Sequence, residues 1–211
     1  MPKILYIDFE GNTSGHLYLV GYSFDGNFHQ VVLDKDLKGL ADHHGFKTMS
    51  LEKFADEISE IIKNESITAI AGYTTHDIEI LRKHKLFKDC LKDLDLAQLD
   101  VHKVVRSYIR KNHLEEFREM VESLPANYHR KRYSLINVML FAEEKVPQDY
   151  GIGKTTSRLN AARAALILRE QDYSRLTTTQ KGKATKALKH NKYDVSSLEK
   201  ILRFTKGIQN N

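Results

Sequence analysis

Apolar runs in the first part of the chain predict a three-stranded antiparallel meander. The run from Ile4 to Ile7 is short and continuous, as expected for a strand that is buried on both faces of a sheet. Residues 16–24 are rich in aromatic and aliphatic side chains, and Asp25-Gly26-Asn27 is a hairpin signal before a partner strand at 28–33. Because the links between these three strands are short, we expect neighbouring strands to pair antiparallel.

The pattern then changes to an alternation of helices and strands. Residues 34–49 are polar and predict a loop, after which Ser50 is a candidate N-cap for a helix with apolar positions at helical spacing. The apolar run 66–73 predicts a buried strand. Since a helix crosses between this strand and the meander, we expect it to lie parallel to the first strand. A helix follows Asp77, and 94–100 predicts a fifth strand.

The rest of the chain is predicted to be helical. Periodic apolar positions indicate helices at 101–124, 133–141 and 155–170, and a last helix over 178–204 in which an interruption is left open. No internal repeat or low-complexity linker divides the chain, and a length of 211 residues suits a single domain over residues 1–211. The sequence therefore predicts an α/β domain with a five-stranded mixed sheet, flanked by helices and extended by C-terminal helices.

Composition narrows the class of protein. Hydrophobic residues make up 41% of the chain and charged residues 29%, which is ordinary for a globular protein in water. No run of about 18 apolar residues predicts a membrane span, and the N-terminus lacks the pattern of a secretory signal. The single cysteine, Cys90, cannot form an internal disulfide and has no activating arrangement around it. We therefore expect a cytoplasmic location and no catalytic role for this thiol.

The charge distribution suggests a kind of partner. The formal net charge is +5, which many proteins without a nucleic-acid role also reach. A solvated helix face explains any one cluster of basic residues, but several clusters together favour a polyanionic partner. The clusters are Lys181, Lys183, Lys186, Lys189 and Lys192, then Arg130, Lys131 and Arg132, and finally Arg106, Arg110 and Lys111.

Two carboxylates, Asp8 and Glu10, directly follow the first apolar run, with one residue between them. Residues i and i+2 of a strand point to the same face, so both acids project from one side of a central strand. Two unpaired anions there would repel each other and resist burial, whereas a bound cation removes both objections. Oxygen ligands suit Mg²⁺ or Mn²⁺. The alternative is a pair of acids on a solvated strand end.

A third carboxylate, Asp77, stands where the strand at 66–73 gives way to a helix. One interpretation is an aspartate that caps the helix N-terminus. The other places this carboxylate at the carboxyl end of a strand beside Asp8, where open α/β sheets form their sites.

The segment Gly151 to Thr156 resembles the end of a phosphate-binding P-loop. That motif needs a glycine where Gln148 stands and a buried strand immediately before it, and neither is present. Nucleoside-triphosphate binding is therefore not expected, although a loop before a helix N-terminus suits a single phosphate of a bound strand.

Near the C-terminus, His190 and Asp194 stand four positions apart, on one face of a helix. Together with Asp8, Glu10 and Asp77, in this order, the pair resembles the DEDD superfamily of 3′–5′ exonucleases. The closest likeness is to its ribonuclease-H-like branch of predicted exonucleases, whose final motif often reads Tyr-Asn-x-x-Asp-Val. The likeness extends over most of the chain and includes two further segments, Gly72-Tyr73 and Tyr133-Ser134-Leu135.

Two departures from the family pattern matter. The histidine class has four residues between the histidine and the aspartate, whereas this chain has three, which is the spacing of the tyrosine class. The long separation of Asp77 from Asp194 indicates inserted helices. A competing alignment places the last motif at Leu159 to Ala165, which lacks both the histidine and the aspartate and would make an inactive protein. We prefer His190 and Asp194.

The resemblance implies a ribonuclease-H-like fold and two Mg²⁺ or Mn²⁺ ions that hydrolyse DNA or RNA from a free 3′ end. It implies that Asp8 bridges both ions, that Glu10 and Asp194 complete one ion site, and that Asp77 holds the second ion. His190 would accept the proton of the attacking water. The side chains that would contact the nucleic acid are Lys183, Lys186 and Lys189 for phosphates, and Phe9, Tyr73 or His76 for the terminal base.

Two other functions remain open at this point. One is a catalytically inactive nucleic-acid-binding module on the same fold, since a fold alone does not establish activity. The other is a structure-specific endonuclease with the same residues.

Overall fold

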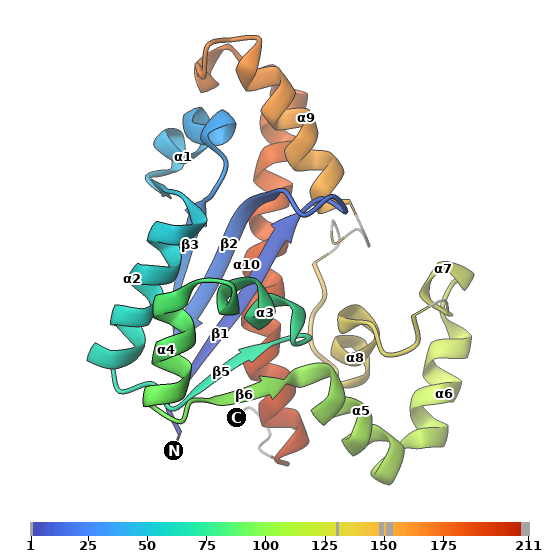
Figure 1. The fold of residues 1–211 in the computed structure, drawn as a ribbon. Coiled ribbons are helices and arrows are strands. Elements are labelled where there is room, and N and C mark those ends of the chain that lie inside the picture. The colour runs from blue at the N-terminus through green and yellow to red at the C-terminus, as the bar shows by residue number, and fades with distance from the viewer. Residues whose placement is uncertain (1, 130, 148–149, 151–153, 208–211) are drawn as a thin grey trace.

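A computed structural model describes residues 2–129, 131–147, 150 and 154–207 of the chain (Figure 1). Its centre is a six-stranded mixed sheet with the strand order β4-β3-β2-β1-β5-β6. The strands are β1 (Ile4–Gly11), β2 (Leu17–Phe24), β3 (Asn27–Val32), β4 (Lys47–Thr48), β5 (Ala69–Gly72) and β6 (Ala97–Asp100).

Strand directions follow the sequence pattern. β1, β2 and β3 form the predicted antiparallel meander, in which Asp8 of β1 lies opposite Gly21 of β2. β5 pairs with β1 in parallel, and β6 pairs with β5 in parallel. The carboxyl ends of β1, β5 and β6 therefore meet at one edge of the sheet, which is the edge where the two acids of β1 lie.

The prediction of five strands with a loop at 34–49 is wrong in detail. This segment contains the short helices η1 (Lys35–Leu37) and α1 (Lys38–His44), followed by β4, which pairs in parallel with β3. Leu37, Leu40 and Ala41 are fully buried, and their helical spacing is the pattern in the sequence that indicates these helices. β4 has only two residues and both are exposed, so it leaves no periodic apolar pattern.

The remaining helices cover the two faces of the sheet or lie beside it (Figure 1). They are α2 (Leu51–Asn64), α3 (His76–Arg82), α4 (Lys85–Asp93), α5 (Val101–Asn112), α6 (Leu114–Ser123), α7 (Ala126–His129), α8 (Leu135–Phe141), α9 (Thr155–Ile167), η2 (Tyr173–Arg175) and α10 (Thr178–Thr205). The first three of these helices cover one face, while α10 crosses the other face with α9 and α5 beside it (Figure 1). None of the helices described here is long and apolar enough to cross a membrane.

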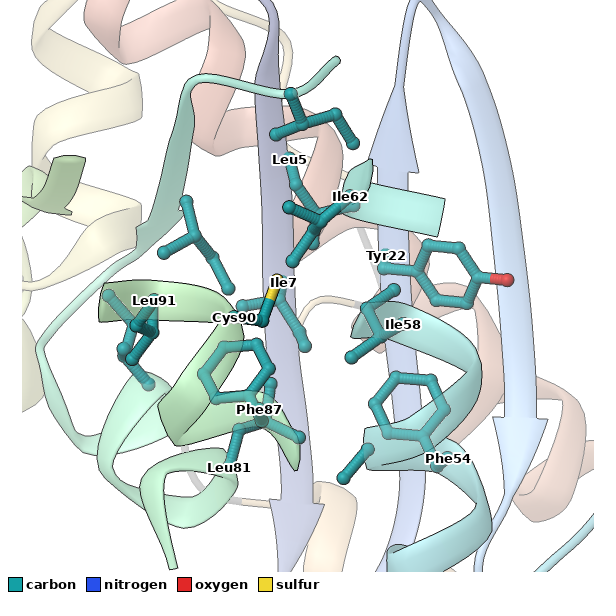
Figure 2. Packing of buried hydrophobic residues seen from close by; sticks show 14 of the residues in the cluster. Leu5, Ile7, Tyr22, Phe54, Ile58, Ile62, Leu81, Phe87, Cys90 and Leu91 are labelled. Atoms are coloured by element: carbon teal, nitrogen blue, oxygen red, sulfur yellow. The ribbon is translucent and has the colours of Figure 1, made fainter. Parts of the chain in front are cut away.

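The two faces of β1 have different surroundings. Leu5 and Ile7 pack against α2 and α4 in the core shown in Figure 2, where Cys90 is also fully buried. Phe9 continues this face and packs edge-on against Phe54 at a centroid distance of 5.9 Å. Burying each large apolar side chain contributes about 1.5–3 kcal/mol before the entropy cost, so this face anchors the strand. The opposite face of β1 carries the carboxylates of Asp8 and Glu10.

That opposite face of β1 packs against α10. α10 is one continuous helix of 28 residues, so the interruption left open in the sequence does not occur. It begins at a capping box in which the Thr177 side chain accepts from Gln180 N and the Gln180 side chain accepts from Thr177 N. Its first half packs on α9 and its second half on α5 and α8. The middle of α10 thus crosses β1 and β2.

Candidate metal centre

Asp8 and Glu10 lie at the carboxyl end of β1 and share one face, as the strand alternation predicts. They face α10, because Asn191 of that helix donates from Nδ2 to Asp8 Oδ2 at 2.8 Å. Thr155, at the start of α9, donates a side-chain hydrogen bond to Glu10. The two acids therefore face a helix with polar side chains and are not on a solvated strand end.

Asp77 is turned toward β1. Its Oδ1 accepts a hydrogen bond from Phe9 N at 3.1 Å, and the residue is buried. Thr75 occupies the N-cap position of α3, so Asp77 is the second residue of the helix and does not act as the capping residue. The structure thus joins β1 and α3 through this carboxylate.

His190 and Asp194 come from the middle of α10 and are both buried. His190 Nε2 lies 3.3 Å from Asp194 Oδ2. Glu10, His190 and Asp194 each offer one ligand atom, and these atoms all lie within 4.8 Å of one another. A strand and a helix that are far apart in the sequence thus bring three metal-ligating groups to one point.

Burial raises the pKa values of all four carboxylates, and neighbouring carboxylates raise those of Asp8, Glu10 and Asp194 further. Burial raises the pKa of Asp8 well above its ordinary value, and the charges of Asp194, Glu10 and Asp77 raise it further. Burial and the charges of Asp194 and Asp77 raise the pKa of Glu10 to about 8. Burial raises the pKa of Asp194 to about 7 and that of Asp77 to about 6. Without a cation, the cluster resists holding four negative charges.

The donor set fits a divalent cation. Carboxylate oxygens with one imidazole nitrogen form a ligand set that suits several divalent metals. His190 Nδ1 is buried without a hydrogen-bond partner, which is costly unless the nitrogen is used. Burial, followed by the charge of Arg158, lowers the pKa of His190 to about 4. The imidazole is therefore neutral at pH 7, the form that binds a metal or accepts a proton.

No protein-family model matches the chain, and no curated protein matches it.

The predicted base-stacking residues lie in three different surroundings. Phe9 points to the α2 face, away from α10. Tyr73 is half-buried, and its hydroxyl donates to Tyr133 O. His76 is exposed at the start of α3, next to Asp77.

The predicted phosphate-binding lysines form an exposed row on α10. Lys183, Lys186 and Lys189 are all exposed. Lys186 and Lys189 line a cleft of about 380 Å³ whose walls also include Tyr150 and His190. The row thus leads toward the carboxylates. Arg130, of the second basic cluster, lies outside the described residues.

The hydrogen bonds of Asn191 with Asp8 and Gln30 were not predicted from the sequence. Asn191 is fully buried, and its Nδ2 donates both to Asp8 Oδ2 and to Asp8 O, the latter at 3.1 Å. Its Oδ1 accepts from Gln30 Nε2 at 2.9 Å, which fixes the orientation of the amide. Gly21, opposite Asp8, leaves the room that this side chain occupies. The signal in the sequence was the asparagine inside the His190–Asp194 motif.

Gly21→Ala is expected to destabilise the protein by about 1–3 kcal/mol, the usual cost of overpacking. An added Cβ would overlap Asn191 Oδ1, and the side-chain amide cannot retreat without losing its bonds to Gln30 through Oδ1 and to Asp8 through Nδ2. Gly182→Ala is the matched control, because its Cβ would meet nothing within 4 Å on α10 and alanine favours a helix. Urea unfolding measures both. Equal stability of the two variants would contradict the packing of Asn191 against Gly21.

Tyr150 is a second residue that sequence reasoning missed. Its ring stacks on His190 at a centroid distance of 4.1 Å with an angle of 3° between the planes. Its hydroxyl donates to Asp194 Oδ1, and burial with the charge of Asp194 raises the pKa of the phenol. Tyr150 therefore covers one face of the imidazole and occupies one oxygen of a candidate ligand.

The competing last motif, Leu159 to Ala165, has a packing role. Leu159, Ala162 and Ala165 are buried against α10 and the segment around α1, and Arg163 Nε pairs with Asp34 Oδ2 at 2.8 Å. Of the segment that resembles a P-loop, Gln148, Gly151 and Gly153 lie outside the described residues. Thr156, which the structure does describe, donates from Oγ1 to Gly11 O at 2.7 Å. The start of α9 thus supports the end of β1.

The metal-free protein is expected to lose stability as the pH rises from about 5 to about 8. The raised pKa values of Glu10, Asp194 and Asp77 mean that the folded state holds protons which the unfolded chain has released above about pH 4.5. Stability from these protons is present at low pH and is lost as the pH passes through about 6, 7 and 8. The lowered pKa of His190 acts in the opposite direction, but it is one group against several.

Thermal unfolding in chelator across this pH range checks the expectation. The slope should be shallower in Asp194→Asn, and added Mg²⁺ or Mn²⁺ should restore stability mainly at the alkaline end. A melting temperature of the parent that rises over this range would contradict the coupling of the carboxylates.

Proposed function

We propose that this protein is a metal-dependent 3′–5′ exonuclease of the DEDD type, with a ribonuclease-H-like fold. The observation that carries the proposal is the convergence of Asp8, Glu10, Asp77 and Asp194 with His190 at the carboxyl end of β1. The antiparallel meander followed by parallel β5 and β6 supports the fold assignment.

Asp8 would contact two cations, Glu10 and Asp194 would complete one ion site, and Asp77 would hold the other. When bound, a pair of Mg²⁺ or Mn²⁺ ions supplies Lewis-acid stabilisation of the attacking and leaving oxygens of a phosphodiester. His190, neutral at pH 7, would accept a proton from the attacking water. Asn191 holds the Asp8 carboxylate in place from the side of α10.

The row of lysines on α10 supports a polyanionic substrate. Lys186 and Lys189 present positive charge along the cleft that reaches His190, and Lys183 is exposed on the same helix. Contacts of this kind bind backbone phosphates without reading the base sequence. A nucleic-acid strand would follow this row to the carboxylates.

A cytoplasmic location stays a prediction.

One observation favours the inactive-module alternative. The Tyr150 hydroxyl occupies an oxygen of Asp194 that a metal would use, and its ring covers His190. A binding module with this arrangement would hold a strand without cutting it. Activity would require the Tyr150 phenol to leave Asp194, so that this carboxylate could hold a cation.

The test is incubation of 5′-labelled single-stranded DNA and RNA with Mg²⁺, Mn²⁺ or chelator. We expect a ladder that shortens from the 3′ end with metal and no products with chelator. A 3′-blocked strand and a circular strand are the controls, because an exonuclease requires a free end. Cutting of the circle would indicate an endonuclease, and strand binding without cleavage under any condition would leave the inactive module.

A further inference from the structure

The outward face of α5 is a continuous basic stripe. Lys103, Arg106, Arg110 and Lys111 follow helical spacing, and with Ser107 they line an open groove of about 500 Å³. All of them are exposed. The opposite face of the helix, which includes Val101, Val105 and Ile109, is buried against the core that contains α10. The stripe runs for about 12 Å, from a rise of 1.5 Å per residue.

Most of these charges have no acidic partner. Among the described residues, no carboxylate lies within ion-pair distance of Arg106, Arg110 or Lys111, while Lys103 reaches Asp100 at 3.5 Å. Arg110 and Lys111 lie in the last turn, where the helix dipole favours cations, but Arg106 does not. Like charges four residues apart, as in Arg106 and Arg110, weaken a helix. The stripe therefore lacks an explanation in the stability of α5 itself.

Aromatic rings lie between the stripe and the carboxyl end of β5. α5 begins where β6 ends, at the sheet edge that also carries the ends of β1 and β5. Tyr73, which follows β5, donates to Tyr133 O, and the Arg106 guanidinium lies 5.6 Å from the centre of the Tyr133 ring. His102 lies beside both rings, at 5.5 Å and 6.4 Å. Basic groups interleaved with aromatic rings are typical of single-strand binding.

A membrane surface fits this helix poorly. A helix that binds lipid needs an exposed apolar face beside its basic residues. The apolar face of α5 is covered by the core, and Val104 is its one large apolar side chain that the structure leaves exposed, at 37%.

We propose that the basic stripe of α5 binds the phosphate backbone of single-stranded nucleic acid, as a site separate from the lysine row of α10. Guanidinium groups bind phosphate oxygens in pairs, and the groove opens to solvent along its length. The carboxylates would then lie between two basic surfaces. That the strand is also the substrate rests on the proposed function, but the binding itself does not.

The test is strand binding in chelator, where no metal-dependent cleavage occurs. A long fluorescein-labelled oligothymidylate or oligouridylate is titrated with the parent and with the triple variant Arg106→Gln, Arg110→Gln, Lys111→Gln at several salt concentrations. The control triple variant loses the same charge from ion-paired positions elsewhere: Lys38→Gln, Arg118→Gln, Arg203→Gln. All six side chains are exposed, and circular dichroism verifies folding.

We expect the stripe variant to lower the slope of log Kd against log salt by about 2, because each phosphate contact to a single strand contributes about 0.7. Affinity should fall about tenfold or more at low salt, while the control variant keeps nearly the parent slope. Equal slopes in all three proteins would overturn the proposal. Loss of binding to anionic phospholipid vesicles, with strand binding unchanged, would overturn it in favour of a membrane.

Failure of this proposal and failure of the proposed function give different results. If the parent binds strands through α5 but never cleaves them, the stripe survives and the exonuclease does not. If the parent cleaves strands and the stripe variant keeps the parent salt slope, the exonuclease proposal survives and the stripe proposal does not.

Discussion

Asp8→Asn is expected to lower metal-dependent cleavage by at least about 10³-fold. Metal stabilisation of the reacting oxygens contributes several kcal/mol, and each 1.36 kcal/mol corresponds to a factor of ten in rate. Asp8 is central because it lies among the other three carboxylates, and their charges all raise its pKa. An amide in its place removes the charge that two cations would share.

The same variant is expected to fold at least as well as the parent. An asparagine at position 8 still offers an oxygen to Asn191 Nδ2, and one of the mutually repelling charges is gone. In chelator, its melting temperature should therefore equal or exceed that of the parent, and added Mn²⁺ should raise it much less. Cleavage by Asp8→Asn at the parent rate would remove the two-metal assignment.

His190→Ala is expected to lower single-turnover cleavage by roughly 10²–10⁴-fold, the usual contribution of a positioned base. The imidazole lies 3.3 Å from Asp194 and is neutral at pH 7, so it is ready to accept a proton. Mn²⁺ affinity should change little if the carboxylates supply most of the binding. A large loss of Mn²⁺ affinity would instead make His190 a metal ligand.

Two further variants separate chemistry from packing at this position. His190→Gln keeps much of the volume under the Tyr150 ring but has no basic nitrogen, so we expect it to be as slow as His190→Ala. His190→Tyr should retain more activity than either, because a phenol at this spacing can orient the water from the same helix face. Full turnover in folded His190→Ala would remove the residue from the mechanism.

Elements with strong periodic patterns could be predicted from the sequence. The apolar run before Asp8, the hairpin signal at Asp25-Gly26 and the capped helix at Ser50 all correspond to elements of the structure. β4 could not be found, because two exposed polar residues that pair with β3 carry no apolar pattern. The continuity of α10 was also uncertain from the sequence, since polar residues and Gly182 interrupt its apolar pattern while tertiary packing keeps it whole.

The candidate site likewise has features that could be predicted from the sequence and features that could not. The convergence of Asp8, Glu10, Asp77, His190 and Asp194 could be predicted, because Asp8 and Glu10 share a strand face, Asp77 follows the parallel strand beside it, and one helix face carries the last two. The role of Tyr150 could not be predicted, since its contact with Asp194 joins positions 44 residues apart. The Gln30–Asn191–Asp8 hydrogen bonds join three elements, and no spacing in the sequence records that. Contacts between distant segments depend on the packing of α10 across the sheet.

A Mn²⁺ titration followed by electron paramagnetic resonance tests most directly whether the carboxylates form a metal centre. Free Mn²⁺ gives the signal, so binding appears as its loss. We predict saturable binding of a pair of ions by the parent, competition by Mg²⁺, and loss of most binding in Asp194→Asn, while Asp34→Asn, a buried carboxylate paired with Arg163, leaves binding unchanged. A free signal that rises in proportion from the first addition, as it does without protein, would contradict the metal centre and the nuclease built on it.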